Sequence, residues 1–328
     1  MNYLITGATG FIGPHLIRRL TSEGHRCKCL ARKGSESKIP EIPGVTLITG
    51  DITEPETLVG IAEGTDCVLH LATIGHMSNF TVTEEMFESI NVQGTINIMN
   101  EAIHSGVKKI VHCSSTAAMG ICDEIPSTEY SICKPHHPYG RSKLKAEKEI
   151  LRMVKESSLP AVIVRFSMVY GPGEPRDMLK IIRLKKKGLL PKIGSKPKLT
   201  PLIHMEDAIQ GLLLASQKGR IGEIYLITNP KPEPFDDIVK FIQEGLGSSK
   251  PSIFIPEWVA LSMATLIEKT FSLMKMNPPV SRKNIESTLA DRVFSIKKAQ
   301  LELDFHPQIN PNAGIKEMVD WYLKNGWI

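Results

Sequence analysis

The chain has 328 residues, 41% apolar and 23% charged, which is ordinary for a folded globular protein and long enough to bury a large core. Its 40 basic and 35 acidic residues leave a net charge of +5, which is too small to indicate nucleic-acid binding. The six cysteines form no CxxC pair and no zinc-type spacing with histidine, so we expect no metal site, no disulfide and a cytoplasmic location.

Short apolar runs alternate with helical stretches in the first 115 residues, a pattern typical of βαβ units around a parallel sheet. Strands are expected at residues 3–6, 27–31, 45–49, 67–71, 109–114, 161–166 and 223–227. Helices are expected to begin near Phe11, Pro55, Glu84, Gly140, Met205 and Pro234. Because βαβ crossovers are right-handed almost without exception, this order predicts an α/β fold with a doubly wound, Rossmann-type sheet.

A glycine-rich loop follows the first expected strand, since residues 3–13 read YLITGATGFIG and lead into a helix. Glycines let the backbone turn tightly and approach a phosphate, and free N–H groups at the helix start attract an anion. Three glycines alone could form only a tight turn, but in this strand–loop–helix context they predict a dinucleotide pyrophosphate site. The expected contact residues are Gly7, Thr9, Gly10, Phe11, Ile12 and Gly13.

The second expected strand ends in CLARK at residues 29–33, where folds that prefer NAD usually offer an acid to the adenosine ribose. Arg32 could instead pair with the 2′-phosphate of NADP, so the sequence favours NADP without excluding NAD. The alternative is that Arg32 and Lys33 are solvated surface cations. Asp51 and Ile52 follow the third strand and are placed to meet the adenine, although Asp51 could equally form a turn.

Two Tyr-x-x-x-Lys pairs occur, and helical geometry separates them. Lys134 of the pair that begins at Tyr130 precedes a proline, which disfavours helical backbone. The pair Tyr139 and Lys143 follows Pro138 and opens a helix, so its side chains share one face. Lowering a phenol pKa from about 10 to about 7 requires about 4 kcal/mol, and an ammonium about 4 Å away supplies up to about that amount. Tyr139 is therefore expected to act as a general acid or base.

Taken together, the motifs resemble the extended short-chain dehydrogenase/reductase superfamily, also called the NAD-dependent epimerase/dehydratase family. The resemblance covers nearly the whole chain. It rests on residues 6–13, 50–51, 70–72, 91–95, 114–115, 139–143, 165–173, 204–207 and 294–322. It implies a nicotinamide cofactor, a small-molecule substrate and, by analogy, a homodimer formed through helices at 84–105 and 140–157.

The resemblance also assigns residues to the site. Ser115, five residues before Gly120, would be the catalytic hydroxyl together with Tyr139 and Lys143. Lys143 would also reach the cofactor's ribose. The family pattern places Leu71, Ala72 and Asn91 near the cofactor, and Phe166 and Val169 near the nicotinamide.

The second half of the chain is richer in glycine and proline. We therefore expect residues 1–165 to form the NAD(P)-binding domain and residues 166–328 mostly a substrate-binding lobe, with sheet contributions from about 161–170 and 223–227. The apolar stretch 258–267 is about half as long as a membrane span, and the glycine motif leaves no room for a signal peptide, so we expect no transmembrane segment. Residues 258–267 are expected to form an amphipathic helix, with a membrane-surface or apolar-substrate role as the alternative.

The substrate is less well specified. Met168 stands where sugar-nucleotide epimerases of the family usually have asparagine, and residues 282–293 contain no Arg-x-Gly-Asp element. Residues 255–258, 278–282 and 294–296 instead resemble the 3β-hydroxysteroid-dehydrogenase-like and dihydroflavonol-reductase-like branch, which acts on apolar ketones and secondary alcohols. Residues 176–198, with nine Lys or Arg and one Asp, would suit a phosphorylated substrate or form a solvated helix face that ends at Gly188.

Three functions follow from these observations. The first is an NAD(P)-dependent oxidoreductase that transfers hydride between the cofactor and a secondary alcohol or ketone. The second is a nucleotide-sugar epimerase or dehydratase in which the cofactor is reduced only transiently. The third is a cofactor-binding regulatory or assembly protein without turnover, against which the intact Ser115, Tyr139 and Lys143 set argues.

Overall fold

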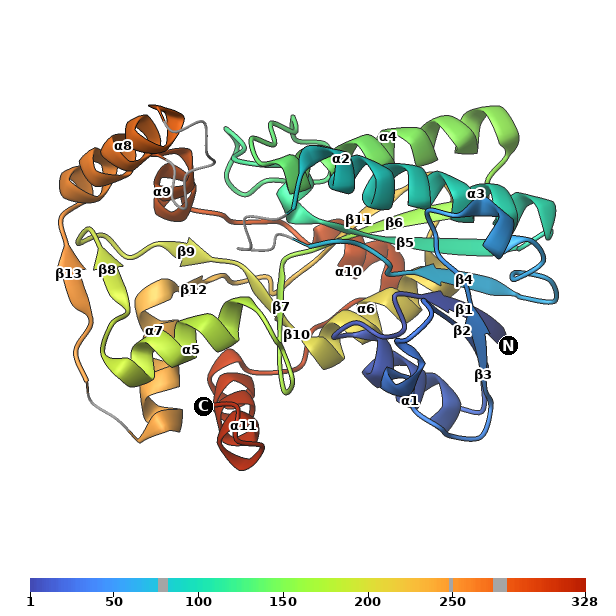
Figure 1. The fold of residues 1–328 in the computed structure, drawn as a ribbon, viewed down its shortest axis with the longest axis horizontal. Coiled ribbons are helices and arrows are strands. Elements are labelled where there is room, and N and C mark those ends of the chain that lie inside the picture. Colours follow the sequence, from blue (N-terminus) through green and yellow to red (C-terminus); the bar gives the residue numbers. More distant parts are fainter. Residues whose placement is uncertain (76–81, 248–249, 274–281) are drawn as a thin grey trace.

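A seven-stranded sheet in the order β11-β6-β5-β4-β1-β2-β3 forms the centre of the computed structural model, which describes residues 1–75, 82–247, 250–273 and 282–328. All of its strand pairs are parallel, which confirms the doubly wound α/β fold (Figure 1). Residues 278–281, which belong to the segment that resembles the 3β-hydroxysteroid-dehydrogenase-like branch, lie outside the described residues. The strands are β1 (Asn2–Thr6), β2 (Arg26–Ala31), β3 (Val45–Thr49), β4 (Cys67–His70), β5 (Lys109–Ser115), β6 (Ala161–Phe166) and β11 (Ile224–Ile227).

Helices cover both faces of the sheet because successive strand residues point to opposite sides. In β1, Tyr3 and Ile5 belong to one buried cluster with α1 (Gly13–Ser22), α6 (Met205–Lys218) and α10 (Lys297–Leu303). Leu4 belongs to the other cluster, with α3 (Gly94–His104) and α4 (Pro138–Ser157). Figure 1 shows α3 and α4 on one side of the sheet and α1 and α6 on the other.

The expected strands are confirmed to within one residue at each end, but one expected helix, near Pro55, does not form. The helix expected near Pro55 is only a 3₁₀ turn, Pro55–Leu58, and Gly60 soon follows with a positive φ of 75°. The helix that begins at Glu84 is α2 (Glu84–Phe87), which continues through a π-helical segment, Glu88–Gln93, into α3. The two remaining 3₁₀ turns are Glu36–Lys38 and Thr116–Ala118.

A smaller lobe lies beside the sheet (Figure 1). It has its own buried cluster, to which Tyr170, Ile182, Ile238 and Tyr322 belong. Its helices are α5 (Asp177–Lys187), α7 (Phe235–Leu246), α8 (Glu257–Leu273), α9 (Arg282–Leu289) and α11 (Pro311–Lys324). Its short strands pair as β7 (Met168–Tyr170) with β10 (Leu202–His204), β8 (Pro191–Ile193) with β13 (Ile253–Ile255), and β9 (Leu199–Thr200) with β12 (Glu233–Pro234).

Two expectations about the lobe can be compared with the structure. Gly188 follows α5 with a φ of 75°, as expected, and Lys185 of that basic stretch is buried and donates to the carbonyl of Lys250. The apolar stretch lies in α8, where Trp258 is 72% exposed, so one side of this helix is not covered by described residues. Within the ranges that the structure describes, no helix combines the length and hydropathy needed to cross a membrane.

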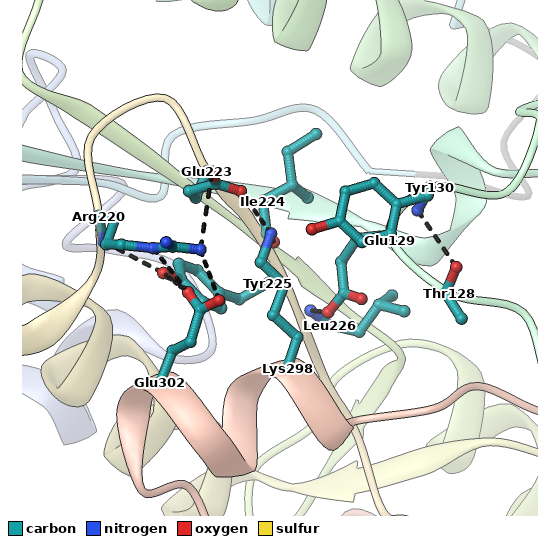
Figure 2. A network of polar contacts seen from close by, with 10 residues as sticks. All are labelled: Thr128, Glu129, Tyr130, Arg220, Glu223, Ile224, Tyr225, Leu226, Lys298 and Glu302. Carbon is teal, nitrogen blue, oxygen red and sulfur yellow. Dashed lines mark hydrogen bonds and ion pairs between the residues drawn. The ribbon is translucent and has the colours of Figure 1, made fainter.

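The outer edge of β11 is closed by side chains from two other segments (Figure 2). The Leu226 amide donates to the Glu129 carboxylate at 2.9 Å, and Lys298 of α10 donates to the Ile224 carbonyl at 2.8 Å. Edge strands with free N–H and C=O groups can pair with other chains. Glu129 and Lys298 therefore block pairing at this edge of the sheet.

A buried ion pair ties α4 to β5 and β6. Arg165 donates to both carboxylate oxygens of Glu147, at 3.0 and 2.7 Å, and the Ser114 hydroxyl donates to the same carboxylate. The Arg165 and Glu147 side chains are 3% and 1% exposed. Because Ser114 and Arg165 immediately precede Ser115 and Phe166, the ion pair determines how the ends of β5 and β6 meet α4.

Replacing Glu147 with alanine is expected to lower the free energy of unfolding by about 3–5 kcal/mol, because Arg165 would then be a buried charge without its counterion. Glu156→Ala on the same helix removes an exposed partner of Arg152 and should cost less than about 1 kcal/mol. Urea unfolding monitored by circular dichroism measures both. Equal losses for the two variants would contradict the structural role of Glu147.

Candidate functional site

A cleft of about 1120 Å³ lies at the carboxyl ends of the parallel strands. Ligands of such sheets bind at this edge, where the loops after successive strands diverge. The loops after β1, β2, β4, β5 and β6 all contribute lining residues. Of the residues expected from the sequence, those that line the cleft are Gly7, Thr9, Gly10, Phe11, Ile12, Gly13, Arg32, Asp51, Ile52, Leu71, Ala72, Ser115, Tyr139, Phe166 and Val169.

The glycine loop is packed so closely that side chains are excluded at two positions. A Cβ at Gly7, where φ is +73°, would lie 2.6 Å from the amide nitrogen of Ala72. A Cβ at Gly13 would lie 2.3 Å from the carbonyl oxygen of Ala8. At Gly10 a Cβ would meet only the Gly7 oxygen, at 3.2 Å, and would occupy space beside the cleft.

The helix that follows this loop offers an uncapped N-terminus. No side chain caps α1, and its first turn holds no acidic residue. Backbone N–H groups at such an end are free to bind an anion, and the helix dipole favours negative charge there. The loop and the helix end together fit the pyrophosphate of a nicotinamide dinucleotide.

At the end of β2, Arg32 and Lys38 both line the cleft. Neither side chain makes a hydrogen bond or an ion pair with the rest of the described chain. The carboxylate of Asp51 accepts from the Thr53 amide at 2.9 Å and from the Thr53 hydroxyl at 2.8 Å, so Asp51 forms a turn while also lining the cleft. This end of the cleft thus carries two cations whose donors are available to a ligand.

The two neighbouring serines of β5 have different surroundings. Ser114 is 5% exposed and its hydroxyl donates to Glu147. Ser115 is half-buried, lines the cleft and accepts from the Ala117 amide at 3.1 Å. Burial raises the pKa of Tyr139, and the Ser115 hydroxyl and the charge of Arg176 partly offset this rise. Ser115 and Tyr139 therefore share one wall of the cleft.

Lys143 does not pair with the Tyr139 phenol as the helical spacing suggested. Its Nζ donates to the Cys113 carbonyl at 2.7 Å and lies 3.3 Å from His112 Nε2. Lys143 is only 1% exposed, and burial lowers its pKa to about 8. The spacing of four residues places the two side chains on one face of α4, but the end of the long lysine chain turns toward β5.

Two buried histidines lie side by side beneath Lys143. His70 and His112 are paired across β4 and β5, with ring centroids 5.3 Å apart. Burial lowers the pKa of His70 to about 3 and that of His112 well below its usual range, so both rings are neutral. A neutral His112 can accept from the Lys143 ammonium, which it could not do if protonated.

Asn91 lies beneath the cleft rather than on its wall. Its Oδ1 accepts from the Thr73 hydroxyl and the Ile74 amide, both at 2.8 Å, and its Nδ2 donates to the Ser142 hydroxyl at 2.9 Å. The amide is 1% exposed and fully engaged in these bonds. Asn91 thus joins the loop after β4 to the first turns of α4, and its position near a bound cofactor stays a prediction.

The second Tyr-x-x-x-Lys pair has no such geometry. Tyr130 is 78% exposed, and Lys134 forms an ion pair with Asp123 at 2.5 Å. Neither residue lies in a helix or lines the cleft.

Several lining residues were not expected from the sequence. Gly75 follows β4, and Arg176 precedes α5, in a part of the chain where the sequence predicted only a basic stretch. His136 and His137 stand directly before the Tyr139 helix, so their position could have been noticed. The remaining ones at the substrate end are Glu174, Asp177, Thr288 and Arg292.

Comparison with known proteins places these features in a family. A model described as the NAD dependent epimerase/dehydratase family matches residues 3–228. Short-chain dehydrogenase/reductase family 42E member 1 of Mus musculus is 28% identical over 98% of this chain and 87% of its own. The Schizosaccharomyces pombe protein named sterol-4-alpha-carboxylate 3-dehydrogenase erg26, decarboxylating, is 27% identical over 98% of this chain and 97% of its own.

Among solved structures, that of gox2253 has a TM-score of 0.88 and 29% sequence identity, and the similarity covers 99% of both chains. The strand order, the glycine loop at the sheet's carboxyl edge and the match over residues 3–228 lead to one conclusion. The chain belongs to the NAD-dependent epimerase/dehydratase family within the extended short-chain dehydrogenase/reductase superfamily, and it is an enzyme of this type.

Proposed function

We propose that the enzyme interconverts a secondary alcohol and a ketone, with net turnover of a nicotinamide cofactor. The observation that carries this proposal is the meeting of the Ser115 hydroxyl and the Tyr139 phenol in the same cleft as the glycine loop. The similarity to a protein named as a 3-dehydrogenase over almost the full length of both chains supports an alcohol substrate. When bound, the nicotinamide would accept the hydride from the substrate carbon or return it.

Each residue of the site then has one task. Ser115 holds the substrate oxygen, and Tyr139 receives the hydroxyl proton during oxidation or donates it during reduction. Asn91 and the Glu147–Arg165 ion pair keep the strand ends and α4 in place around them. Lys143 would supply a positive charge near Tyr139 and would hold the cofactor ribose, and His112 and the Cys113 carbonyl hold its ammonium.

We also propose how the chain is divided and where it works. Residues 1–165 would mainly hold the cofactor and residues 166–328 mainly the substrate, since Phe166 to Val169 and Arg176 line the other end of the cleft. A cytoplasmic homodimer that pairs through α3 and α4 is the proposed assembly. The six cysteines are all free in the structure, which suits a reducing compartment.

Tyr139→Phe is expected to lower kcat by about 10²–10⁴-fold, because the acid–base group is lost while the packing of the ring is kept. Cofactor affinity, measured by fluorescence titration, should change little. Tyr130→Phe is the matched control and should retain activity, since Tyr130 lies outside the cleft. Near-normal turnover by Tyr139→Phe would contradict the assignment.

Lys143→Met is expected to abolish activity and yet raise the free energy of unfolding near pH 7, by up to about 3 kcal/mol. The pKa of Lys143 is about 8 in the folded protein, compared with 10.5 for an exposed lysine such as that of the unfolded chain, so folding disfavours its charged form. Between these values the unfolded chain binds more protons, and the wild-type protein gains stability as the pH rises. The advantage of the variant should therefore shrink from pH 8 to pH 10.5 in urea unfolding series. An advantage that stays constant over this range would show that Lys143 is not destabilised by its charge.

NADP preference is proposed from Arg32 and Lys38. Replacing both with alanine should weaken NADP binding about tenfold or more, because charge-assisted bonds to a 2′-phosphate would be lost. NAD binding should change far less, and Lys33→Ala is a control at a neighbouring cation that does not line the cleft. Tighter binding of NAD than of NADP by the wild-type protein would refute the preference.

A further inference from the structure

The guanidinium of Arg176, an exposed residue, lies against Gly75 at the substrate end of the cleft. A Cβ added to Gly75 would lie only 2.2 Å from Arg176 Nη1, so the guanidinium rests directly on the loop after β4. Both residues line the cleft, as does Tyr139. The absence of a side chain at residue 75 is what leaves room for the arginine there.

This guanidinium makes no hydrogen bond or ion pair with the residues that the structure describes. The carboxylate of Glu174 lies nearby in the chain, but it is buried and accepts from the backbone amides of Arg176 and Met178 at 2.7 and 2.9 Å. Asp177 is adjacent in sequence, but its carboxylate forms no ion pair with Arg176 in the described part of the chain. The N–H donors of Arg176 therefore have no acceptor among the described residues, although an arginine fork is suited to a planar carboxylate.

The charge of Arg176 also affects the pKa of Tyr139. Burial raises the pKa of Tyr139, whereas the Ser115 hydroxyl and the charge of Arg176 lower it. Lys143, by contrast, is directed to the Cys113 carbonyl and His112. Arg176 and Tyr139 thus line one cleft, and the charge of the guanidinium acts on the phenol that would handle the substrate's hydroxyl proton.

We propose that Arg176 binds a carboxylate that the substrate carries close to its reacting carbon, an inference that rests on the proposed dehydrogenase function. A ligand bound at the Tyr139 phenol would bring a neighbouring carboxylate within reach of the guanidinium seated on Gly75. A monoanion fits this position better than a phosphate dianion, because the exposed carboxylate of Asp177 lines the same part of the cleft and raises the pKa of Tyr139. Repulsion from Asp177 would grow with each further negative charge on the ligand.

A role of Arg176 limited to the Tyr139 pKa is the competing explanation. That role would affect a charged and an uncharged substrate alike, because the same proton is transferred in both. Binding of a carboxylate would affect only the charged one. The ratio of the two specificity constants therefore separates anion recognition from a general effect on the proton transfer.

The test compares 2-hydroxycyclohexane-1-carboxylate with its methyl ester as substrates of the full-length protein. Oxidised cofactor is supplied, and formation of the reduced cofactor is followed at 340 nm. The wild-type protein should prefer the acid, and Arg176→Gln should lower the acid-to-ester ratio of kcat/KM by about 10–100-fold. Arg176→Lys, which keeps the charge but loses the planar fork, should give an intermediate ratio. Gly75→Ala should also lower the ratio, since a methyl group there displaces the guanidinium.

Lys180→Gln is the matched control, because Lys180 is an exposed cation one turn further along α5 that does not line the cleft. Its ratio should equal that of the wild-type protein. Circular dichroism of each variant verifies that it is folded. The dissociation constant of the acid for the cofactor-bound protein, measured by calorimetry, should rise with Arg176→Gln by a similar factor.

An unchanged ratio in Arg176→Gln, a wild-type preference for the ester, or absence of acid binding to the cofactor-bound protein would each overturn the proposal. Tighter binding of 2-hydroxycyclohexyl phosphate than of the carboxylate would overturn the choice of anion. Tyr139-dependent turnover of the ester with an unchanged ratio would leave the dehydrogenase function standing and remove only the role of Arg176. A protein that binds neither NAD nor NADP would instead remove the proposed function.

Discussion

The ion pair between Glu147 and Arg165 is the constraint on which the geometry of the cleft depends. It joins three elements, and each of its members is next to, or one helical turn from, a residue of the candidate site. Ser114, which donates to the same carboxylate, precedes Ser115, and Arg165 precedes Phe166. Glu147 lies four residues after Lys143 on α4. A buried pair of this kind contributes little net stability compared with apolar residues, but either partner alone would be very costly. Its value here lies in requiring one arrangement of β5, β6 and α4.

A second set of buried polar contacts acts in the same way from the other side. Asn91 stands in the π-helical segment and joins the loop after β4 to Ser142 of α4. The Ser142 hydroxyl in turn donates to the Tyr139 carbonyl at 2.8 Å. Ser115 and Tyr139, the proposed catalytic side chains, are thus positioned by residues that take no part in the proposed reaction. Such support from behind is what keeps reacting groups in place without filling the cleft.

The sequence predicted which backbone segments line the cleft, but it did not predict where the ends of the long side chains lie. Gly7, Gly10 and Gly13 could be assigned because local sterics decide where a chain can turn against a neighbouring strand, and Tyr139 could be separated from Tyr130 because Pro135 breaks helical geometry at Lys134. The position of the Lys143 ammonium depends instead on which acceptors β5 presents, and no local pattern contains that information. Arg176 was missed for the same reason, since its partner in space is Gly75, about a hundred residues earlier in the chain.

The closure of the β11 edge has a consequence for how the molecule is made. The groups that satisfy this edge come from Glu129, before the strand, and from Lys298, some seventy residues after it. A ribosome releases residues 224–227 well before Lys298, so the nascent sheet has a half-open edge while α7, α8 and the chain between them are synthesised. Only when α10 docks does the Ile224 carbonyl obtain its donor, Lys298. The C-terminal part of the chain therefore completes this edge of the sheet late in synthesis. Before α10 docks, the edge is most exposed to pairing with other strands.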